Sequence, residues 1–218
     1  MGPTGQAAGF VGGALYSQRM SAAAGRAGAA GLVEVRSAVG RFDDFYEVVG
    51  VKKPGGKGCW CMSYRDSRVK DDGRPEFMRR LCESEPGPGV LAYADGVPAG
   101  WCSIAPRSSY RRLMHARTIP FVDERDAWVA VCFVVRGGYR RRGLMHALLD
   151  GAVEHAAAHD AEVVEGYPVE VPEGERVDVT SGYVGTTRLF EAHGFHRAAP
   201  TTGHSGGRPR WIMRRELG

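Results

Sequence analysis

The stretch Val134-Val-Arg-Gly-Gly-Tyr-Arg-Arg-Arg-Gly-Leu-Met-His-Ala-Leu-Leu149 decides the fold of this chain. It predicts the end of a buried strand, a turn dense in glycine and arginine, and the start of a helix. Such a turn leaves the first backbone N–H groups of the helix unpaired and adds the positive end of its dipole, so it can bind a phosphate. Gly143 lets the backbone approach the phosphate, and Arg140, Arg141 and Arg142 add positive charge. The patterns G-x-x-x-x-G-K-[ST] and G-x-G-x-x-G are absent, which argues against a P-loop and against a dinucleotide-binding fold.

Strands and helices alternate around this stretch. The run Ala127–Val135 is apolar at nearly every position, as in a central strand that is covered on both faces. Apolar residues between Met145 and Ala156 recur at the spacing of one helix face, and Asp95-Gly96 predicts a tight turn between strands at 90–94 and 97–104. Further strands are expected at 32–36, from 161 onward, near 195–198 and near 210–214, and further helices at 42–49, 75–82 and 186–193. The pattern predicts a mixed α/β sheet flanked by helices.

The chain is long enough for one packed domain and marginal for two. It has 218 residues, of which 43% are hydrophobic, so we expect one domain. Residues 1–30 are rich in glycine and alanine and have few large apolar side chains, which predicts a mobile leader before a folded domain at 31–218. The content of arginine, glycine and alanine is typical of a GC-rich bacterial genome.

Charge, hydropathy and cysteine content exclude several classes of protein. Lys and Arg number 29 against 25 Asp and Glu, and the net charge of +4 is well below that of a dedicated nucleic-acid-binding protein. The longest apolar run, Ala127–Val135, is far shorter than the roughly 20 residues of a membrane-spanning helix, and no secretory signal is evident. We therefore expect a cytoplasmic protein that binds neither nucleic acid nor membranes. Several of the five cysteines sit in apolar runs, which favours reduced thiols.

Two segments carry a resemblance to a known family. Arg140-Arg-Arg-Gly-Leu-Met145 resembles the pyrophosphate loop [QR]-x-x-G-x-[GA] of the GNAT superfamily of acyl-CoA-dependent N-acyltransferases, matching it at Arg140 and Gly143. Met145 stands where the family has a small residue. The segment Arg188-Leu-Phe-Glu-Ala-His-Gly-Phe195 is similar to a later helix of the family and its Gly-Phe ending.

This resemblance implies the GNAT fold and acetyl-CoA as co-substrate. In the family, the edge of the strand before the loop hydrogen-bonds the pantetheine arm, and the loop holds the pyrophosphate. The residues expected to bind the cofactor are therefore Phe133, Val134, Val135, Arg140, Arg141, Arg142, Gly143, Leu144, Met145 and His146, the last of which could equally be a surface residue.

The catalytic residues are less obvious. Many members of the family protonate the departing CoA thiolate with a tyrosine, but this chain has Phe190 at that position, so Tyr183 or solvent is expected to supply the proton. A backbone N–H of Val134 or Val135 can stabilise the oxyanion. For the base that takes the proton of the amine, Glu165 is the first candidate, because it lies at the end of the fifth strand, and Asp126 and Glu124 come next.

Aromatic residues are candidates for the acceptor site. Trp60, Trp101 and Tyr167 could line a substrate pocket, although core packing explains the two tryptophans equally well. No metal is expected, because Cys59-x-Cys61 lacks a second pair of ligands. The arginines at 107, 111, 112 and 117 favour a solvated face or a site for an acidic group, and His155 and His159 are expected to be solvated.

The sequence thus predicts a transferase that moves an acetyl group from acetyl-CoA to a primary amine of a small molecule by direct attack. No Ser-His-Asp or Cys-His pattern suggests a covalent intermediate. Two alternatives stay open: a protein or peptide N-acetyltransferase, which would need a long open groove, and a non-catalytic acyl-CoA-binding regulatory module. Dimers are common in the superfamily, so a homodimer is a possible assembly.

Overall fold

The apolar run that precedes the glycine- and arginine-rich turn forms the middle strand of a seven-stranded sheet. The computed structural model describes residues 32–52, 56–175 and 182–218, and the leader predicted at 1–30 lies outside them. The strands run in the order β1-β2-β3-β4-β5-β7-β6, with β4 and β5 parallel and the other neighbours antiparallel. Their bounds are Val33–Ser37 (β1), Gly89–Ala94 (β2), Val97–Pro106 (β3), Trp128–Val135 (β4), Val163–Gly166 (β5), His196–Ser205 (β6) and Arg208–Glu216 (β7).

The helices follow the predicted order. The α-helices are Phe42–Val49 (α2), Gly73–Cys82 (α3), Arg111–Met114 (α4), Leu144–Ala157 (α5) and Thr187–Ala192 (α6), and short 3-10 turns occur at Arg107–Ser109 (η1), Gly137–Tyr139 (η2) and Gly182–Val184 (η3). The predicted helices at 42–49, 75–82 and 186–193 are confirmed as α2, α3 and α6, to within about two residues. The short helix α4 carries too few apolar positions for its periodicity to show in the sequence.

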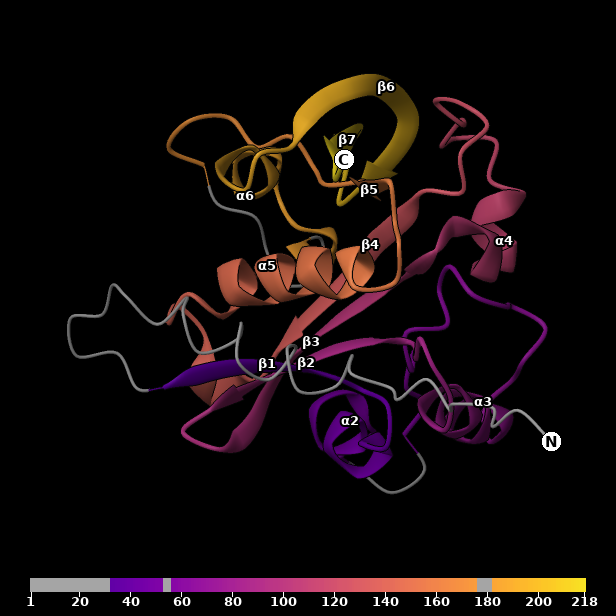
Figure 1. Ribbon diagram of the computed structural model, residues 1–218, viewed down its shortest axis with the longest axis vertical. Helices are drawn as coiled ribbons and strands as arrows, with labels where there is room; N and C mark the ends of the chain where they lie inside the picture. The colour runs from indigo at the N-terminus through magenta and orange to yellow at the C-terminus, as the bar shows by residue number, and fades with distance from the viewer. Residues whose placement is uncertain (1–31, 53–55, 176–181) are drawn as a thin grey trace, which may run out of the picture. The chain divides into compact units, whose positions relative to one another are not determined.

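Helices cover both faces of the sheet (Figure 1). The amphipathic helix α5 packs on one face over a core that includes Ala130, Phe133 and Leu148. On the other face, α2 and α3 pack over a second core around Phe45 and Trp101. A third core on this side, around Val131, lies toward β5 and β7. Because β4 contributes side chains to all of these cores, its nearly continuous apolar sequence is explained.

The hairpin predicted at Asp95-Gly96 is confirmed. Asp95 and Gly96 have φ angles of 53° and 79° and join β2 to β3, as a two-residue turn of this kind requires. The last hairpin is longer than predicted, because β6 and β7 extend from His196 to Glu216 around Gly206 and Gly207. β6 is an edge strand whose residues are exposed or half-buried except at Gly203, so no alternation of apolar residues marks its length in the sequence.

One prediction about α5 is wrong. His155 is not solvated but buried, and its Nε2 donates a 2.9 Å hydrogen bond to the carbonyl oxygen of Pro86. The imidazole also lies edge-on against Trp128, with ring centroids 5.7 Å apart. His159 is half-buried one turn later.

In the ranges that the structure describes, none of the helices has the length and apolar character needed to cross a bilayer.

Candidate active site

The two parallel strands in the middle of the sheet, β4 and β5, separate after Gly166. β4 and β5 pair over three positions, from Trp128 opposite Val164 to Ala130 opposite Gly166. β4 continues to Val135, whereas β5 ends, and Val169 then bridges to Thr186 and Arg210. Among the described residues, the last part of β4 therefore has no strand paired with the edge that β5 leaves. A substrate with amide groups can hydrogen-bond to such an edge.

A β-bulge sits where this edge begins. Ser103 of β3 pairs with Cys132, but the next residue, Ile104, pairs with Ala130, so Val131 is an extra residue in β4. The bulge places Val131 and Cys132 on the same face of the sheet, the one opposite α5. It therefore changes which side chains of β4 face each side of the sheet.

The predicted strand-edge residues lie just after this bulge. Phe133 points into the core under α5 and meets Phe190 with ring centroids 6.2 Å apart. Val134 packs on the opposite face and Val135 on the α5 face. Their side chains are thus committed to packing. The Arg136 N–H donates to the carbonyl oxygen of Ala99 in β3 at 2.9 Å, so in this antiparallel pair the backbone groups of Val134 face β3 and those of Phe133 and Val135 face the open edge. At that edge, Nε of Arg140 lies 3.4 Å from the Val135 carbonyl oxygen.

The turn after β4 is built around left-handed residues. Arg141 has a φ of 62°, and Gly143, which caps α5, has a φ of 77°. A Cβ added to Gly143 would meet no atom within 4 Å, so its backbone conformation and not crowding favours glycine. Among the described residues, no side chain caps the N-terminus of α5, and this end is free to receive an anion.

The other residues of the loop divide into solvent-facing and anchoring groups. The side chains of Arg140, Arg141 and Arg142 are exposed, as expected for residues that would contact a phosphate. Leu144 is buried and Met145 packs against the same core. The methionine at the position where the family has a small residue is therefore half-buried and packs against the core beneath the loop.

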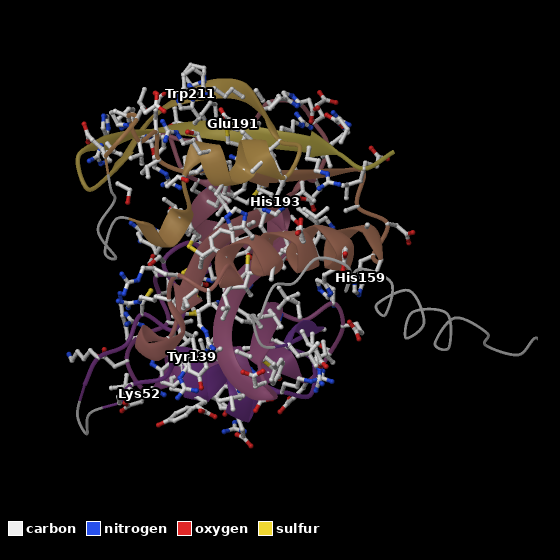
Figure 2. The ribbon with its side chains drawn as sticks, turned by 90° about the vertical axis from the view of Figure 1, so that its left-hand side faces the viewer. Lys52, Tyr139, His159, Glu191, His193 and Trp211 are labelled. Atoms are coloured by element: carbon white, nitrogen blue, oxygen red, sulfur yellow. The ribbon has the colours of Figure 1, made fainter. Side chains whose placement is uncertain are left out.

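His146, on the first turn of α5, belongs to a small polar chain between α5 and α6. Its Nδ1 lies 2.8 Å from Nε2 of His193, and Nδ1 of His193 contacts the carboxylate of Asp150. A carboxylate can only accept, so Nδ1 of His193 donates to Asp150. Figure 2 shows His193 between the two helices. This contact fixes the imidazole of His146 beside the arginine-rich turn.

Glu165, the first candidate for the base, lies inside a buried network. Its carboxylate accepts a 3.0 Å hydrogen bond from the Tyr167 hydroxyl and lies 3.5 Å from Nη1 of Arg107. Arg214 approaches the other carboxylate oxygen at 3.8 Å. Burial raises the pKa of Glu165 above its usual value, although the tyrosine and both arginines oppose the shift. The arrangement is that of a strand-end carboxylate paired with arginines.

Arg107 was not expected in this position. Its side chain is buried, whereas Arg111, Arg112 and Arg117 of the same predicted cluster are exposed, so the prediction of a solvated face is wrong for Arg107. Its Nη2 donates to the carbonyl oxygen of Ile119 at 2.8 Å. The sequence does hold a signal for Arg214 and Arg210, because their period-two spacing in β7 places both on one face with Ile212.

Tyr183, the candidate acid, lies in η3, which packs against β4. It is half-buried and interacts with the Tyr64 hydroxyl, as does Arg210. Burial raises the pKa of Tyr64, with Tyr183 adding to the shift and Arg210 opposing it. The buried Nη2 of Arg210 has no hydrogen-bond partner, although its Nε donates to the carbonyl oxygen of Tyr167 at 2.7 Å. These polar groups gather on the face opposite α5, beside the point where β4 and β5 part.

The predicted substrate-binding aromatics are core residues. Trp101 is fully buried and meets Phe45 edge-on at 4.8 Å, and Trp60 packs against the same phenyl ring at 6.2 Å. Tyr167 is also enclosed, within the Glu165 network. Of the two interpretations of the tryptophans, the structure therefore favours core packing.

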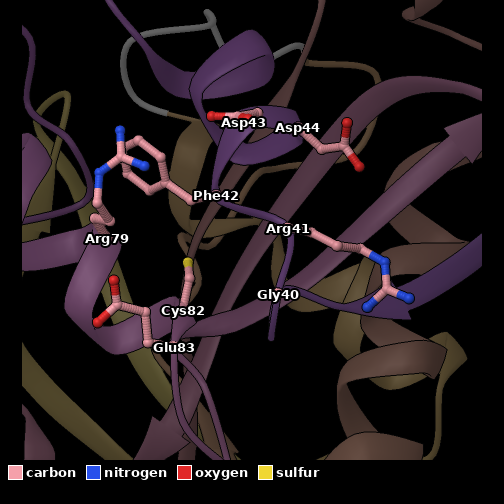
Figure 3. A pocket seen from close by; sticks show the side chains of 8 residues that line it. All are labelled: Gly40, Arg41, Phe42, Asp43, Asp44, Arg79, Cys82 and Glu83. Carbon is pink, nitrogen blue, oxygen red and sulfur yellow. The ribbon is translucent and has the colours of Figure 1, made fainter.

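A separate pocket of about 410 Å³ lies between the turn before α2 and the end of α3 (Figure 3). The guanidinium of Arg79 stacks on Phe42 at its side, 4.0 Å from the ring centroid. Its lining residues are Gly40, Arg41, Phe42, Asp43, Asp44, Arg79, Cys82 and Glu83. None of these comes from the arginine-rich turn or the open edge of β4.

In the part of the chain that is described, no three potential metal ligands of the His, Cys, Asp or Glu type come together.

Comparisons with known proteins concern the family and the fold. The family model described as "Acetyltransferase (GNAT) family" matches residues 59–172. A GNAT-family protein from Desulfovibrio desulfuricans is 16% identical, covers 86% of this chain and 100% of its own, and has a TM-score of 0.50. A GNAT-family acetyltransferase from Streptococcus pneumoniae gives the same values. No curated protein matches the chain significantly. The structural similarity shows the fold.

Proposed function

The chain belongs to the acetyltransferase (GNAT) family, and from this membership we propose that it transfers an acetyl group from acetyl-CoA directly to the primary amine of a small molecule. The observation that carries the proposal is the junction of β4 and α5. An open strand edge leads there into an uncapped helix N-terminus that is surrounded by three exposed arginines.

The residues of this junction fit acetyl-CoA. The free backbone N–H groups at the start of α5 and the left-handed Gly143 suit a pyrophosphate, and Arg140, Arg141 and Arg142 offer charge-assisted hydrogen bonds to it. Backbone groups of Phe133 and Val135 face the open edge, where they could meet the amides of the pantetheine arm. Acetyl-CoA supplies an activated thioester. Of the two predicted donors, Val134 pairs with β3, so the backbone N–H of Val135 would stabilise the negative charge on the thioester carbonyl oxygen.

We propose Tyr183 as the proton donor to the departing thiolate. Phe190, at the position of the tyrosine in many family members, has no proton to give and is buried between Phe133 and Phe195. Tyr183 is half-buried in a turn that packs against β4, close to the place that the thioester would occupy.

We propose Glu165 as the base that takes the proton of the amine. Its raised pKa makes it a stronger base than a solvated carboxylate, and it lies on the strand that separates from β4. Because the carboxylate is enclosed by Arg107, Arg214 and Tyr167, the proton would reach it through a water molecule or through the Tyr167 hydroxyl.

The segment that lies over the acceptor side of the site favours a small-molecule acceptor rather than an extended peptide. The segment at 59–65 is tied to α4, because the backbone N–H of Arg112 hydrogen-bonds to the carbonyl oxygens of Tyr64 and Arg65 at 3.1 and 3.0 Å. Arg65 reaches further, to the carbonyl oxygen of Pro88 at 2.6 Å. These contacts anchor the segment at 59–65 on the face opposite α5, where a peptide acceptor would need a long open groove.

The test is acetyl transfer to a panel of acceptors. The protein is incubated with acetyl-CoA and either small primary amines or unstructured peptides with free N-termini and lysines, and acetylated products are measured by mass spectrometry. Products from small amines support the proposal. Products from peptides alone would assign the chain to protein acetylation, and acetyl-CoA binding without any product would indicate a regulatory module.

A further inference from the structure

Two cysteines that are distant in sequence meet beside the bulge of β4. The sulfur atoms of Cys61 and Cys132 lie 3.3 Å apart. The indole N–H of Trp101 also donates to the Cys61 sulfur, at 2.9 Å. Since an indole N–H can only donate, the Cys61 sulfur is an acceptor in this contact. The two thiols are thus paired with each other, and a fixed donor is aimed at one of them.

The backbone holds Cys61 in this position. Trp60 and Cys61 have φ angles of 52° and 51°, a conformation that residues with a Cβ seldom adopt. Consecutive residues of this kind persist only where the surroundings hold them. Here the Trp60 side chain is buried in the core with Phe45, and the Cys61 side chain is directed toward Cys132. The turn therefore places the two sulfurs in contact.

The other cysteines have different environments. Cys59 is exposed and contacts the Ser63 hydroxyl at 2.9 Å, while Cys82 and Cys102 are buried, as Cys61 is, but have no thiol partner among the contacts that the described residues make. The pKa of Cys61 is lowered by the hydrogen bonds from Cys132 and Trp101 and by the charge of Arg65, against the effect of burial. By contrast, burial raises the pKa of Cys102, and raises that of Cys82 to about 11.

We propose that Cys61 and Cys132 are an oxidisable pair that closes into a disulfide when a hydroperoxide reaches it. The Cys61 thiolate attacks one peroxide oxygen, the O–O bond breaks, and Cys61 becomes a sulfenic acid. The Cys132 sulfur then attacks the Cys61 sulfur, its proton leaves with the sulfenic oxygen as water, and the S–S bond forms. For hydrogen peroxide, two thiols are oxidised and the peroxide is reduced to two water molecules.

Closing the disulfide requires only a small local movement. A disulfide bond is about 2.05 Å long, so the sulfurs need to approach each other by roughly 1 Å. Cys61 is buried and Cys132 is partly exposed, so a small hydroperoxide would reach the Cys61 sulfur from the side of Cys132. The bond would tie the segment at 59–64 to the bulge of β4. If the proposed function is correct, it would also hold the acceptor side of the site rigid and slow acetyl transfer.

The experiment uses the full chain. The reduced protein is treated with hydrogen peroxide, free thiols are blocked with an alkylating reagent, and a digest is analysed by mass spectrometry without reduction. We expect the peptides that contain Cys61 and Cys132 to be joined, with a loss of two hydrogens, and to separate on reduction. Unlinked sulfinic acid at Cys61, or a link from Cys59 to either residue, would overturn the proposal. This measurement uses the protein without substitutions, so its outcome does not depend on whether a variant folds.

Variants and activity complete the test. C61S and C132S should each abolish the link, and the matched control C59S should keep it. The rate of acetyl transfer, measured with an acceptor that the reduced protein acetylates, should fall at least severalfold on oxidation and recover on reduction. In C132S, peroxide treatment should leave this rate unchanged. Unchanged turnover with the link formed would overturn the effect on catalysis. A reduced protein that acetylates no acceptor would instead contradict the proposed function and leave the disulfide result standing.

Discussion

Arg107 and Glu165, 58 residues apart in the sequence, face each other inside the protein with Nη1 of the arginine 3.5 Å from Oε2 of the glutamate. Both side chains are almost completely enclosed, at 2% and 3% exposure. Removing one partner of a buried pair leaves the other charge uncompensated and costs about 3 kcal/mol or more. Glu165 therefore has a structural role that any test of its chemical role must separate.

Glu165→Gln tests both roles of this carboxylate. We expect the free energy of unfolding to fall by about 3 kcal/mol, and turnover at a temperature where the variant is folded to fall by roughly 10²-fold because the base is lost. The affinity for acetyl-CoA should not change. Asp126→Asn is the matched control, since Asp126 is the next candidate and its carboxylate accepts from the Ser108 backbone at 2.9 Å. Normal turnover in the Glu165 variant would contradict the assignment.

The phosphate site is tested by Gly143→Asp. The added carboxylate should repel the pyrophosphate and abolish the thermal shift that acetyl-CoA produces, which is about 2.7 kcal/mol of stabilisation at 100 times its Kd. Gly96→Asp is the control, because Gly96 has nearly the same φ, 79° against 77°, and a Cβ would likewise meet no atom within 4 Å. It places the same charge and strain in the remote β2–β3 turn. A thermal shift that persists in Gly143→Asp would contradict the site.

The contact between His146 and His193 predicts a role in binding. In His193→Ala, His146 loses the partner that fixes its ring beside the loop. We expect the KM for acetyl-CoA to rise severalfold with kcat unchanged, as for a loss of uniform binding. His159→Ala, at the other end of α5, should leave both parameters as they are. A fall in kcat at constant KM would show that His193 acts on the chemical step.

The central part of the fold could be predicted because its signals are local. The continuous apolar run of β4, the glycine at the start of α5 and the Asp95-Gly96 turn each express their structure within a few residues. The buried network around Glu165 could not be predicted in this way. Its members come from distant segments, and a polar residue in a sequence gives no sign of whether partners elsewhere allow its burial.

His155 is a single-residue example of a burial that depends on a distant segment and so could not be predicted from the local sequence. Its partner, the carbonyl oxygen of Pro86, lies in a loop 69 residues away, so helical periodicity alone placed the imidazole in solvent. The open edge of β4 also depends on long-range pairing, because it arises from the short length of β5 and from the bulge opposite Ser103. The resemblance in the loop indicates where the candidate site lies, and the structure shows which residues surround it.

The burial of His155 predicts a dependence of stability on pH. Burial lowers the pKa of His155 to about 4, with the neighbouring His159 adding to the shift. In the unfolded chain the imidazole titrates near 6.5 and therefore binds a proton that the folded chain does not accept. Stability should thus be lost as the pH falls below about 6.5, by roughly 2 to 3 kcal/mol at pH 4.5. Urea unfolding of the native protein and of His155→Gln measures the difference, since glutamine can still donate to Pro86 and does not titrate. Equal pH dependence in the two proteins would show that His155 does not contribute.

The last prediction concerns proton donation to the thiolate. Tyr183→Phe keeps the aromatic ring in η3 and removes only the hydroxyl, so the packing against β4 and the binding of acetyl-CoA should be unchanged. We expect kcat to fall by about tenfold, less than the 10²–10⁴-fold typical of acid catalysis, because a thiolate is already a moderate leaving group. Tyr64→Phe is the control: it removes the hydroxyl that interacts with Tyr183 and leaves the donor itself in place. If solvent supplies the proton instead, both variants will turn over at the rate of the native protein.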